Sequence, residues 1–186
     1  MNLSMSKPIH PDQDRVESLR TKLGLLNLEG EGGLFTEAHV SEILVEAADG
    51  QSPASNCIYY ALTKDQPQNH LHHLTSNDYH ILIEGGPADY FIFYPHGKVD
   101  LFTLGSDLEE GNKLVIATPP NCWKAIRLKN SAEYVLVGSV VTPAWNPNRI
   151  KIGAGQSFVD QFASKASWAT PKLLKSLIGP NWKPEE

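Results

Sequence analysis

The sequence is poor in cysteine and contains no long hydrophobic run. Its 186 residues include two cysteines, Cys57 and Cys122, which do not form a CxxC pair, so we expect no disulfide framework and a reducing compartment. Residues 1–19 contain no apolar stretch like that of a signal peptide, and the most apolar window, 134–141, is too short to cross a bilayer. These absences predict a soluble, cytoplasmic protein.

Clusters of basic residues are also missing. The chain has 16 Lys and Arg against 21 Asp and Glu, a formal net charge of −5. No run of Lys or Arg offers a nucleic-acid surface, and an anionic protein is not attracted to acidic lipid. We therefore predict no nucleic-acid partner and no membrane partner. With 41% apolar and 20% charged residues, the composition is that of a globular protein with its own core.

The N-terminal part of the chain differs from the rest. Its polar residues 1–14 predict a flexible arm, followed by a single domain over residues 15–186. A helical spacing of apolar residues predicts a short amphipathic helix, carried by Val16, Leu19, Leu23 and Leu26. The segment EGEGG, residues 29–33, is expected to end this helix because glycine is costly to hold in one.

From residue 34 to 141 the chain consists of short apolar or alternating runs with turn signals between them. Among these runs are LFTEAHV, CIYYAL, HLHHL, YHILIE, YFIFY, VDLFTL, KLVIAT, WKAIRL and YVLVGSVV. Short strands at this spacing indicate an all-β sandwich or barrel. Residues 143–153 then predict a loop, and residues 155–165 and 170–179 predict two short helices, the second with Thr170 as its N-cap.

Four of the seven histidines lie within residues 69–86, NHLHHLTSNDYHILIEGG. Because side chains alternate between the faces of a strand, His70 and His72 point the same way and His73 points to the opposite face. On the next strand, Asp78 and His80 share one face. The pattern therefore places up to three histidines and a carboxylate on one surface.

Seven motifs then follow one another along the chain. They are EGGLFTE (31–37), IYYALT (58–63), LHHLTSNDYHILIEG (71–85), YPHGKV (94–99), LGSDLEEGN (104–112), TPPNCWKA (118–125) and LVGSVVTPAW (136–145). In order and spacing, from about residue 18 to 181, the chain resembles the cupin superfamily, specifically the cupin-5 family of unknown function. The HILIEG and CWKA variants are most similar to its fungal branch.

This resemblance implies a cupin-type double-stranded β-helix, a jelly-roll barrel, with short N-terminal and C-terminal helices and a ligand cavity inside. It also implies a homodimer, for which an exchanged N-terminal strand is one arrangement. It implies an inward-facing His72, which by strand alternation brings His70 with it, and Asp78 and His80 across the sheet. It does not imply one reaction, because cupins of similar fold have many functions.

The metal-binding form of the cupin signature is matched only in its first half. His70-x-His72 and Gly85 agree with it, and Asp78 stands near the position of its glutamate. The second half ends on Lys124 instead of a histidine, and a lysine ammonium repels a cation. We therefore predict no metal and no other cofactor. The alternative is iron, zinc or nickel held by His70, His72, Asp78 and His80.

The same residues suit chemistry without a metal. His72 and His80 are predicted as acid and base, Asp78 as the group that orients an imidazole, and Lys124 as the stabiliser of a developing anion. This set fits an isomerase, epimerase, cyclase or dehydrating enzyme acting on a small carbonyl compound, such as a sugar derivative or a polyketide- or terpenoid-like intermediate. Two alternatives stay open: a cupin that binds a small ligand without catalysis, and a metal-dependent cupin oxygenase.

A second group of residues is predicted to contact the ligand in the cavity. It comprises His70, Glu37, Tyr60, Phe91, Phe93 and Trp123. For Glu37, an inward position and a surface position are both open. Aromatic residues in a barrel form its core or stack on a planar ligand. Trp123 is expected at the rim, and Trp145 with the C-terminal helices is expected to cap one end of the barrel.

Overall fold

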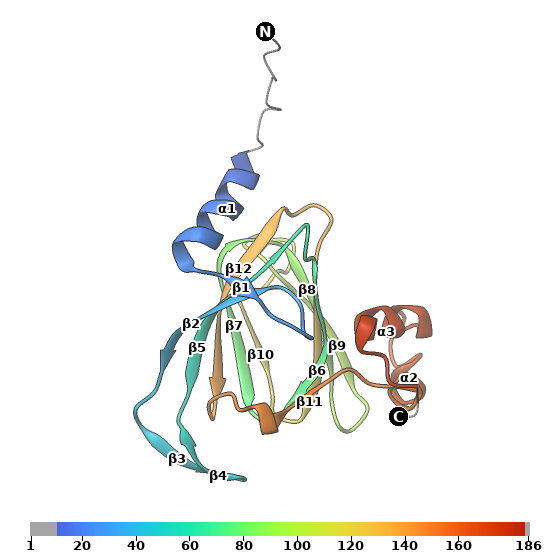
Figure 1. Cartoon of the computed structure of the whole chain (residues 1–186). Helices are drawn as coiled ribbons and strands as arrows, with labels where there is room; N and C mark the ends of the chain where they lie inside the picture. Colours follow the sequence, from blue (N-terminus) through green and yellow to red (C-terminus); the bar gives the residue numbers. More distant parts are fainter. Residues whose placement is uncertain (1–10, 185–186) are drawn as a thin grey trace.

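Two antiparallel sheets form the fold and close into a barrel (Figure 1). The structure, a computed structural model, describes residues 11–184. One sheet has six strands in the order β1-β2-β5-β12-β7-β10, and the other has five in the order β13-β6-β11-β8-β9. Consecutive strands of the sequence alternate between the two sheets over much of the chain, as a jelly roll requires. The predicted all-β class and jelly-roll barrel are confirmed.

The strands agree closely with the runs expected from the sequence. The six-stranded sheet consists of β1 (Leu26–Asn27), β2 (Leu34–Val40), β5 (Asn56–Thr63), β12 (Tyr134–Thr142), β7 (Asn77–Gly85) and β10 (Val115–Thr118). The five-stranded sheet consists of β13 (Ile150–Ile152), β6 (Gln68–Leu74), β11 (Cys122–Leu128), β8 (Ala88–Phe93) and β9 (Val99–Leu104). A separate hairpin, β3 (Leu44–Ala47) and β4 (Gly50–Pro53), extends from the barrel (Figure 1).

Alternation along the strands builds the core between the sheets. In β12, Val135, Val137 and Val141 are buried, and β-branched residues of this kind favour the pleated conformation. Val135 and Val137 meet side chains of the opposite sheet such as Ile92 and Ile126 in one hydrophobic cluster. This cluster fills one part of the barrel, and a cavity occupies another.

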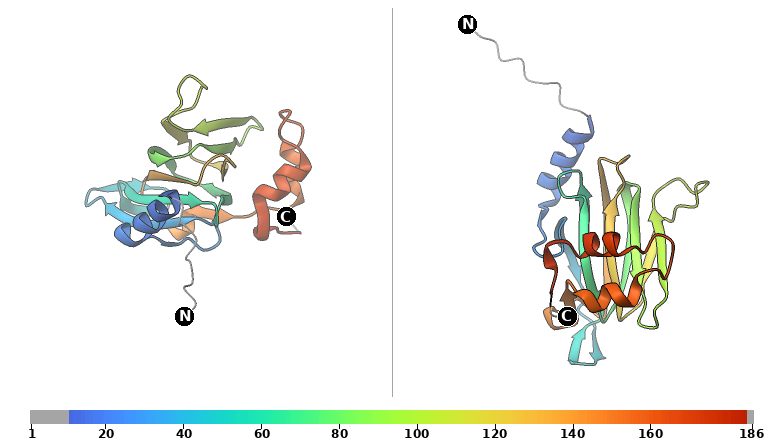
Figure 2. Two further views of the ribbon diagram at one scale, coloured as in Figure 1. Left: turned by 90° about the horizontal axis from the view of Figure 1, so that it is seen from above. Right: turned by 90° about the vertical axis from the view of Figure 1, so that its right-hand side faces the viewer.

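The helices lie outside the barrel. α2 (Gln156–Phe162) and α3 (Pro171–Ile178) cover the outer face of the five-stranded sheet, as Figure 2 shows. Thr170 caps α3, since its hydroxyl accepts a hydrogen bond from the Leu173 N–H at 3.2 Å, as predicted. Two short 3₁₀ helices, η1 (Pro147–Arg149) and η2 (Gly179–Asn181), follow β12 and α3. No helix within residues 11–184 is long and apolar enough to span a membrane.

Three boundaries differ from the sequence-based expectation. α1 (Pro11–Leu23) begins inside the predicted arm, so residues 11–14 are helical, and residues 1–10 lie outside the described range. α1 ends before Gly24, whose φ of +66° is the left-handed conformation that glycine adopts at helix ends, rather than at residues 29–33. The predicted loop 143–153 contains η1 and β13, because pairing with β6 makes β13 a strand.

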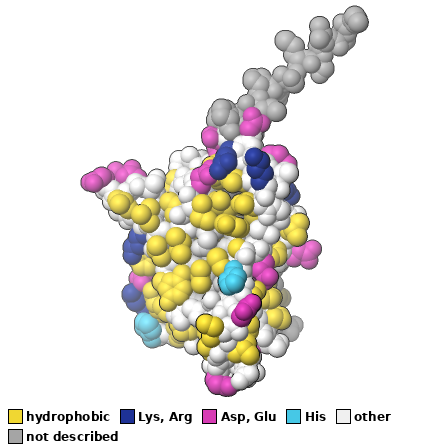
Figure 3. Space-filling model, turned by 90° about the vertical axis from the view of Figure 1, so that its left-hand side faces the viewer, with side chains coloured by type: hydrophobic (Ala, Val, Ile, Leu, Met, Phe, Trp, Pro, Cys, Tyr) yellow, Lys and Arg dark blue, Asp and Glu magenta, His cyan; other side chains and the backbone are white. Residues whose placement is uncertain are grey.

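The outer face of the six-stranded sheet exposes large apolar side chains. Tyr79, Ile81 and Ile83 of β7 are 36%, 43% and 49% exposed, and Val115 of β10, the partner of Ile81, is 48% exposed. Figure 3 views the side of the molecule away from α2 and α3, where hydrophobic side chains gather. Contiguous apolar surface of this kind is typical of protein contacts. We expect this face to be the interface of the homodimer that the family resemblance predicts.

Replacing Ile81 by lysine tests this interface. Ile81→Lys places a charge at the centre of the apolar face, and we expect it to convert a dimer into a monomer in light scattering coupled to gel filtration. Ile43→Lys is the matched control, because Ile43 is 71% exposed and lies outside this face. A wild-type monomer would contradict the dimer, and a dimeric Ile81→Lys variant would contradict the interface.

Candidate active site

A cavity of about 230 Å³ opens between the two sheets. One part of its wall is apolar and includes Leu28, Phe35, Ile58, Leu74, Val141 and Ile150. The other part is polar and includes Glu31, Asn69, His72, Asp78, His80 and Lys124. An apolar cavity with a few converging polar groups is the usual form of a small-molecule site.

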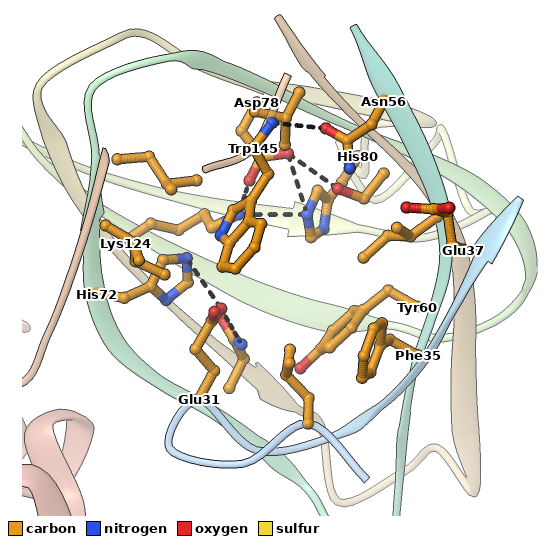
Figure 4. A pocket seen from close by; sticks show the side chains of 17 residues that line it. Glu31, Phe35, Glu37, Asn56, Tyr60, His72, Asp78, His80, Lys124 and Trp145 are labelled. Atoms are coloured by element: carbon orange, nitrogen blue, oxygen red, sulfur yellow. Dashed lines mark hydrogen bonds and ion pairs between the residues drawn. The ribbon is translucent and has the colours of Figure 1, made fainter. Parts of the chain in front are cut away.

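The centre of the polar wall is a buried ion pair between Lys124 of β11 and Asp78 of β7 (Figure 4). Each residue is only 3% exposed. Ser139 of β12 donates a hydrogen bond to Asp78 Oδ1 at 3.1 Å. His80 Nε2 lies 3.2 Å from Lys124 Nζ and 3.4 Å from Asp78 Oδ1. The four groups thus satisfy one another across both sheets.

Their surroundings set the charges of this cluster. Burial alone would raise the pKa of Asp78, but Lys124 and His80 reverse the effect and hold that pKa well below its ordinary value. Burial lowers the pKa of His80, and the neighbouring Lys124 ammonium lowers it further, against the opposing effect of Asp78. The cluster therefore contains a carboxylate and a neutral imidazole near pH 7.

Tyr90 of β8 fixes the His80 ring from the other side. Its hydroxyl lies 2.9 Å from His80 Nδ1, and its ring meets the imidazole edge-on at 87° with the centroids 5.5 Å apart. Nothing in the local sequence pattern indicates that the hydroxyl of Tyr90 reaches a histidine on another strand. His80 is thus held on both ring nitrogens.

His72 presents a free nitrogen to the cavity. Its Nδ1 lies 2.9 Å from the backbone oxygen of His70, and since a carbonyl only accepts, Nδ1 carries the proton. Burial lowers the pKa of His72, Lys124 lowers it further, and Glu31 opposes them. In the neutral ring, Nε2 therefore holds a lone pair, 3.6 Å from Glu31 Oε2 (Figure 4). This geometry is that of a base.

Glu31 reaches the cavity through the glycine-rich bend before β2. Gly33 has φ of +82°, and a Cβ there would overlap the Tyr60 hydroxyl, so the position requires glycine. That hydroxyl donates to the Gly32 oxygen at 2.9 Å and fixes the bend. The sequence predicts the bend but not that Glu31 belongs to the site, because its position depends on contacts with β5 and β6.

A β-bulge in β6 contradicts the predicted position of His70. Lys124 pairs with His72 and Ile126 pairs with Asn69, so two β6 residues, His70 and Leu71, lie opposite one residue of β11. The extra residue interrupts strict alternation. His72 and Asn69 line the cavity, whereas His70 faces α3, with its Nδ1 2.9 Å from Gln68 Nε2. The predicted inward position of His70, as a ligand contact or metal ligand, is wrong, because His70 does not line the cavity.

Three predicted aromatic contacts also lie outside the cavity. Phe91, Phe93 and Trp123 face the C-terminal helices and pack in the cluster that joins these helices to the barrel. The Phe93 and Trp123 rings lie 5.0 Å and 5.7 Å from the ring of Phe158 in α2. Alternation explains this position, since Lys124 faces inward and its neighbour Trp123 must face outward. Their predicted position in the cavity, as ligand contacts, is wrong.

The remaining predicted residues lie along the cavity wall. Tyr60 lines its interior, and Glu37 lines its outer part from an exposed position on β2. Trp145, 47% exposed, also lines the cavity, and its backbone N–H donates a hydrogen bond to Asn56 Oδ1 at 2.8 Å. The C-terminal helices cover a sheet rather than an end of the barrel, so Trp145 lies at the rim without them.

The residues present do not fit a metal ion. His70 is turned away from the cavity. Lys124 Nζ pairs with Asp78 and lies 3.2 Å from His80 Nε2. A divalent cation bound there would meet the ammonium group. Within residues 11–184, no group of three or more His, Cys, Asp or Glu side chains is arranged to hold a metal.

Comparison with known proteins agrees with this barrel. The model of the family Cupin_5, described as cupin superfamily (DUF985), matches residues 17–152. The chain belongs to this family. The uncharacterized protein YML079W of Saccharomyces cerevisiae is 31% identical over 130 residues, which cover 62% of this chain and 64% of the yeast protein. The chain thus spans less than two thirds of the length of this relative.

Two solved structures resemble the fold of this cupin. A hypothetical protein from Leishmania major superposes with a TM-score of 0.73 at 21% identity, covering 84% of this chain and 96% of the other. Protein SO0799 from Shewanella oneidensis superposes with a TM-score of 0.69 at 21% identity, covering 90% and 97%. Both comparisons support the fold of the chain and carry no information on its chemistry.

Removing one partner of the buried ion pair tests its role in this cupin. Lys124→Met leaves the Asp78 carboxylate buried without a cation, so we expect the free energy of unfolding in urea to fall by about 3–5 kcal/mol. Lys98→Met breaks the exposed pair with Asp100 and should cost less than about 1 kcal/mol. Adding Asp78→Asn to Lys124→Met should recover part of the loss. Equal stabilities of the two single variants would contradict this account.

The buried histidines predict that acid destabilises the protein. Because His72 and His80 have lowered pKa values when folded, the unfolded chain binds more protons below its ordinary histidine value of 6.5. We expect the free energy of unfolding to decrease from about pH 7.5 to about pH 5.5. His72→Gln should reduce this slope by up to about 1.4 kcal/mol per pH unit. An unchanged slope in His72→Gln would argue against a neutral buried His72.

Proposed function

We propose that the cavity catalyses proton transfer on a small organic carbonyl compound without a metal or cofactor. The observation that carries this proposal is the state of His72. Its Nδ1 proton is committed to a backbone oxygen, its lowered pKa keeps it neutral, and its Nε2 faces the cavity beside Glu31. A neutral imidazole in this orientation accepts a proton from a bound substrate.

The reaction begins with removal of a proton from the carbon next to the carbonyl group. His72 Nε2 takes the proton, the C–H electron pair forms the new C=C bond, and the carbonyl oxygen becomes an enolate. The imidazolium is stabilised by the Glu31 carboxylate, 3.6 Å from Nε2. Return of the proton to the other face of the same carbon gives epimerisation. Where that carbon carries a hydroxyl, transfer of the hydroxyl proton to the former carbonyl oxygen and return of the abstracted proton to the former carbonyl carbon give isomerisation. Where the β-carbon carries a hydroxyl, the His72 imidazolium returns its proton to that group as the C–O bond breaks, and water is lost.

Lys124 is suited to stabilise the enolate. An ammonium group has three N–H donors, and Asp78 and His80 engage two of them. The third is left for an oxygen of the substrate, at a position whose positive charge is fixed before the reaction begins. We assign His80 and Asp78 as positioning residues for Lys124, because both of their functional groups are engaged within the protein.

A cupin that binds a ligand without changing it is the second candidate. It is favoured by the mutual satisfaction of Lys124, Asp78, Ser139 and His80, which leaves a preformed cavity with few free groups. In that case native mass spectrometry of the purified protein would detect a ligand that stays chemically unchanged on incubation.

Hydrogen exchange in heavy water separates the two candidates. A panel of hydroxy ketones, aldoses and β-keto acids would be incubated with the protein in D₂O, and proton NMR would follow the loss of C–H signals. We expect exchange with at least one class, and a decrease of about 100-fold or more in its rate in His72→Gln. His73→Gln, on the same strand but facing outward against Trp123, should exchange at the wild-type rate. Equal rates in the two variants would refute the role of His72.

A further inference from the structure

One buried polar atom in the cavity has no partner within the protein. Asn69 of β6 is 2% exposed and lines the cavity, and its Oδ1 accepts no hydrogen bond from any described residue. Its Nδ2 lies 3.5 Å from Glu31 Oε2, so the reversed amide orientation would bring two acceptors together. An acceptor left unsatisfied at this depth is costly, which indicates that it serves a bound molecule.

The groups around Asn69 are acceptors as well. The Glu31 carboxylate lies 3.6 Å from His72, and the Nε2 of neutral His72 holds a lone pair. Three acceptors from the bend and from β6 therefore converge on one part of the cavity. A molecule that fits there must offer several hydrogen-bond donors close to one another.

We infer that this part of the cavity binds adjacent hydroxyl groups, so that the ligand is a vicinal diol whose remaining part is apolar. The inference rests on the function proposed above for the same cavity and specifies its substrate class. Hydroxyl groups donate to Asn69 and Glu31 and also accept from the Lys124 ammonium. A ligand ammonium group lacks this second capacity and would meet the charge of Lys124.

The apolar part of the ligand is assigned to the opposite wall. Phe35, Ile58 and Val141 line it, and Trp145 lies at the rim. Figure 4 shows the Phe35 ring beside Tyr60, across the cavity from the Glu31 carboxylate. Flat apolar groups stack on rings of this kind and need no polar partner there. The cavity therefore matches a molecule hydroxylated at one end and flat and apolar at the other.

Three probes with the same aromatic part test the inference: phenyl glyceryl ether, which is a diol, phenoxypropanol and phenoxypropylamine. Their dissociation constants for the full chain would be measured by ligand-observed NMR titration at millimolar concentration. We expect the diol to bind about tenfold more tightly than the mono-alcohol, since it forms additional hydrogen bonds. Asn69→Leu, which keeps the size of the side chain, should remove this preference. His73→Gln should keep the preference.

Each other outcome overturns the inference. Equal affinity for the diol and the mono-alcohol, or no detectable binding of the diol, would do so. A preference for phenoxypropylamine would show that the acceptors serve a cation instead, and a preference that persists in Asn69→Leu would place the diol elsewhere. Because these probes bind without reacting, the outcome is independent of the exchange experiment. Diol binding without exchange in any substrate refutes only the proposed catalysis, and exchange without diol preference refutes only this inference.

Discussion

Lys124 and Asp78 bring a full positive and a full negative charge into the interior of the barrel, where either alone is costly to bury. The pair is tolerated because Ser139 and His80 complete its hydrogen bonds from the neighbouring strands. It joins the two sheets across the cavity and leaves no room for a second cation. Burial lowers the pKa of both buried histidines, and the charge of Lys124 lowers it further. The poor fit of the described residues to a metal ion depends on this one interaction.

Much of the fold follows from local sequence patterns. Strand alternation and turn residues locate nearly all strands of the barrel, and Thr170 marks the start of α3. The exceptions are elements stabilised by their partners. β13 is three residues long and exists through its pairing with β6, and the β3–β4 hairpin lacks a clear apolar alternation. Such elements carry too little local information to be predicted from their own residues.

The site was predictable where alternation holds and unpredictable where it fails. Asp78, His80 and Lys124 lie on the cavity wall, as their strand positions require. His70 does not, because the bulge opposite Ala125 is set by pairing between two distant strands and has no signature in the sequence. Glu31 was missed for a related reason. Its approach to His72 depends on a bend that packs against other strands, and sequence distance does not reveal such contacts.

The bulge in β6 also has a consequence for how such a site can change. Asn69 and His72 are separated by an odd number of positions, so an uninterrupted strand would turn them to opposite faces. Only the additional residue allows Asn69 and His72 to share one wall. A point substitution at Asn69 or His72 therefore changes one side chain of the cavity wall. Deletion of a single residue at the bulge would instead turn Asn69 and His72 to opposite faces of the sheet. The number of residues in this strand, more than their identity, therefore keeps the two proposed roles, ligand binding by Asn69 and proton transfer by His72, on one wall of the cavity.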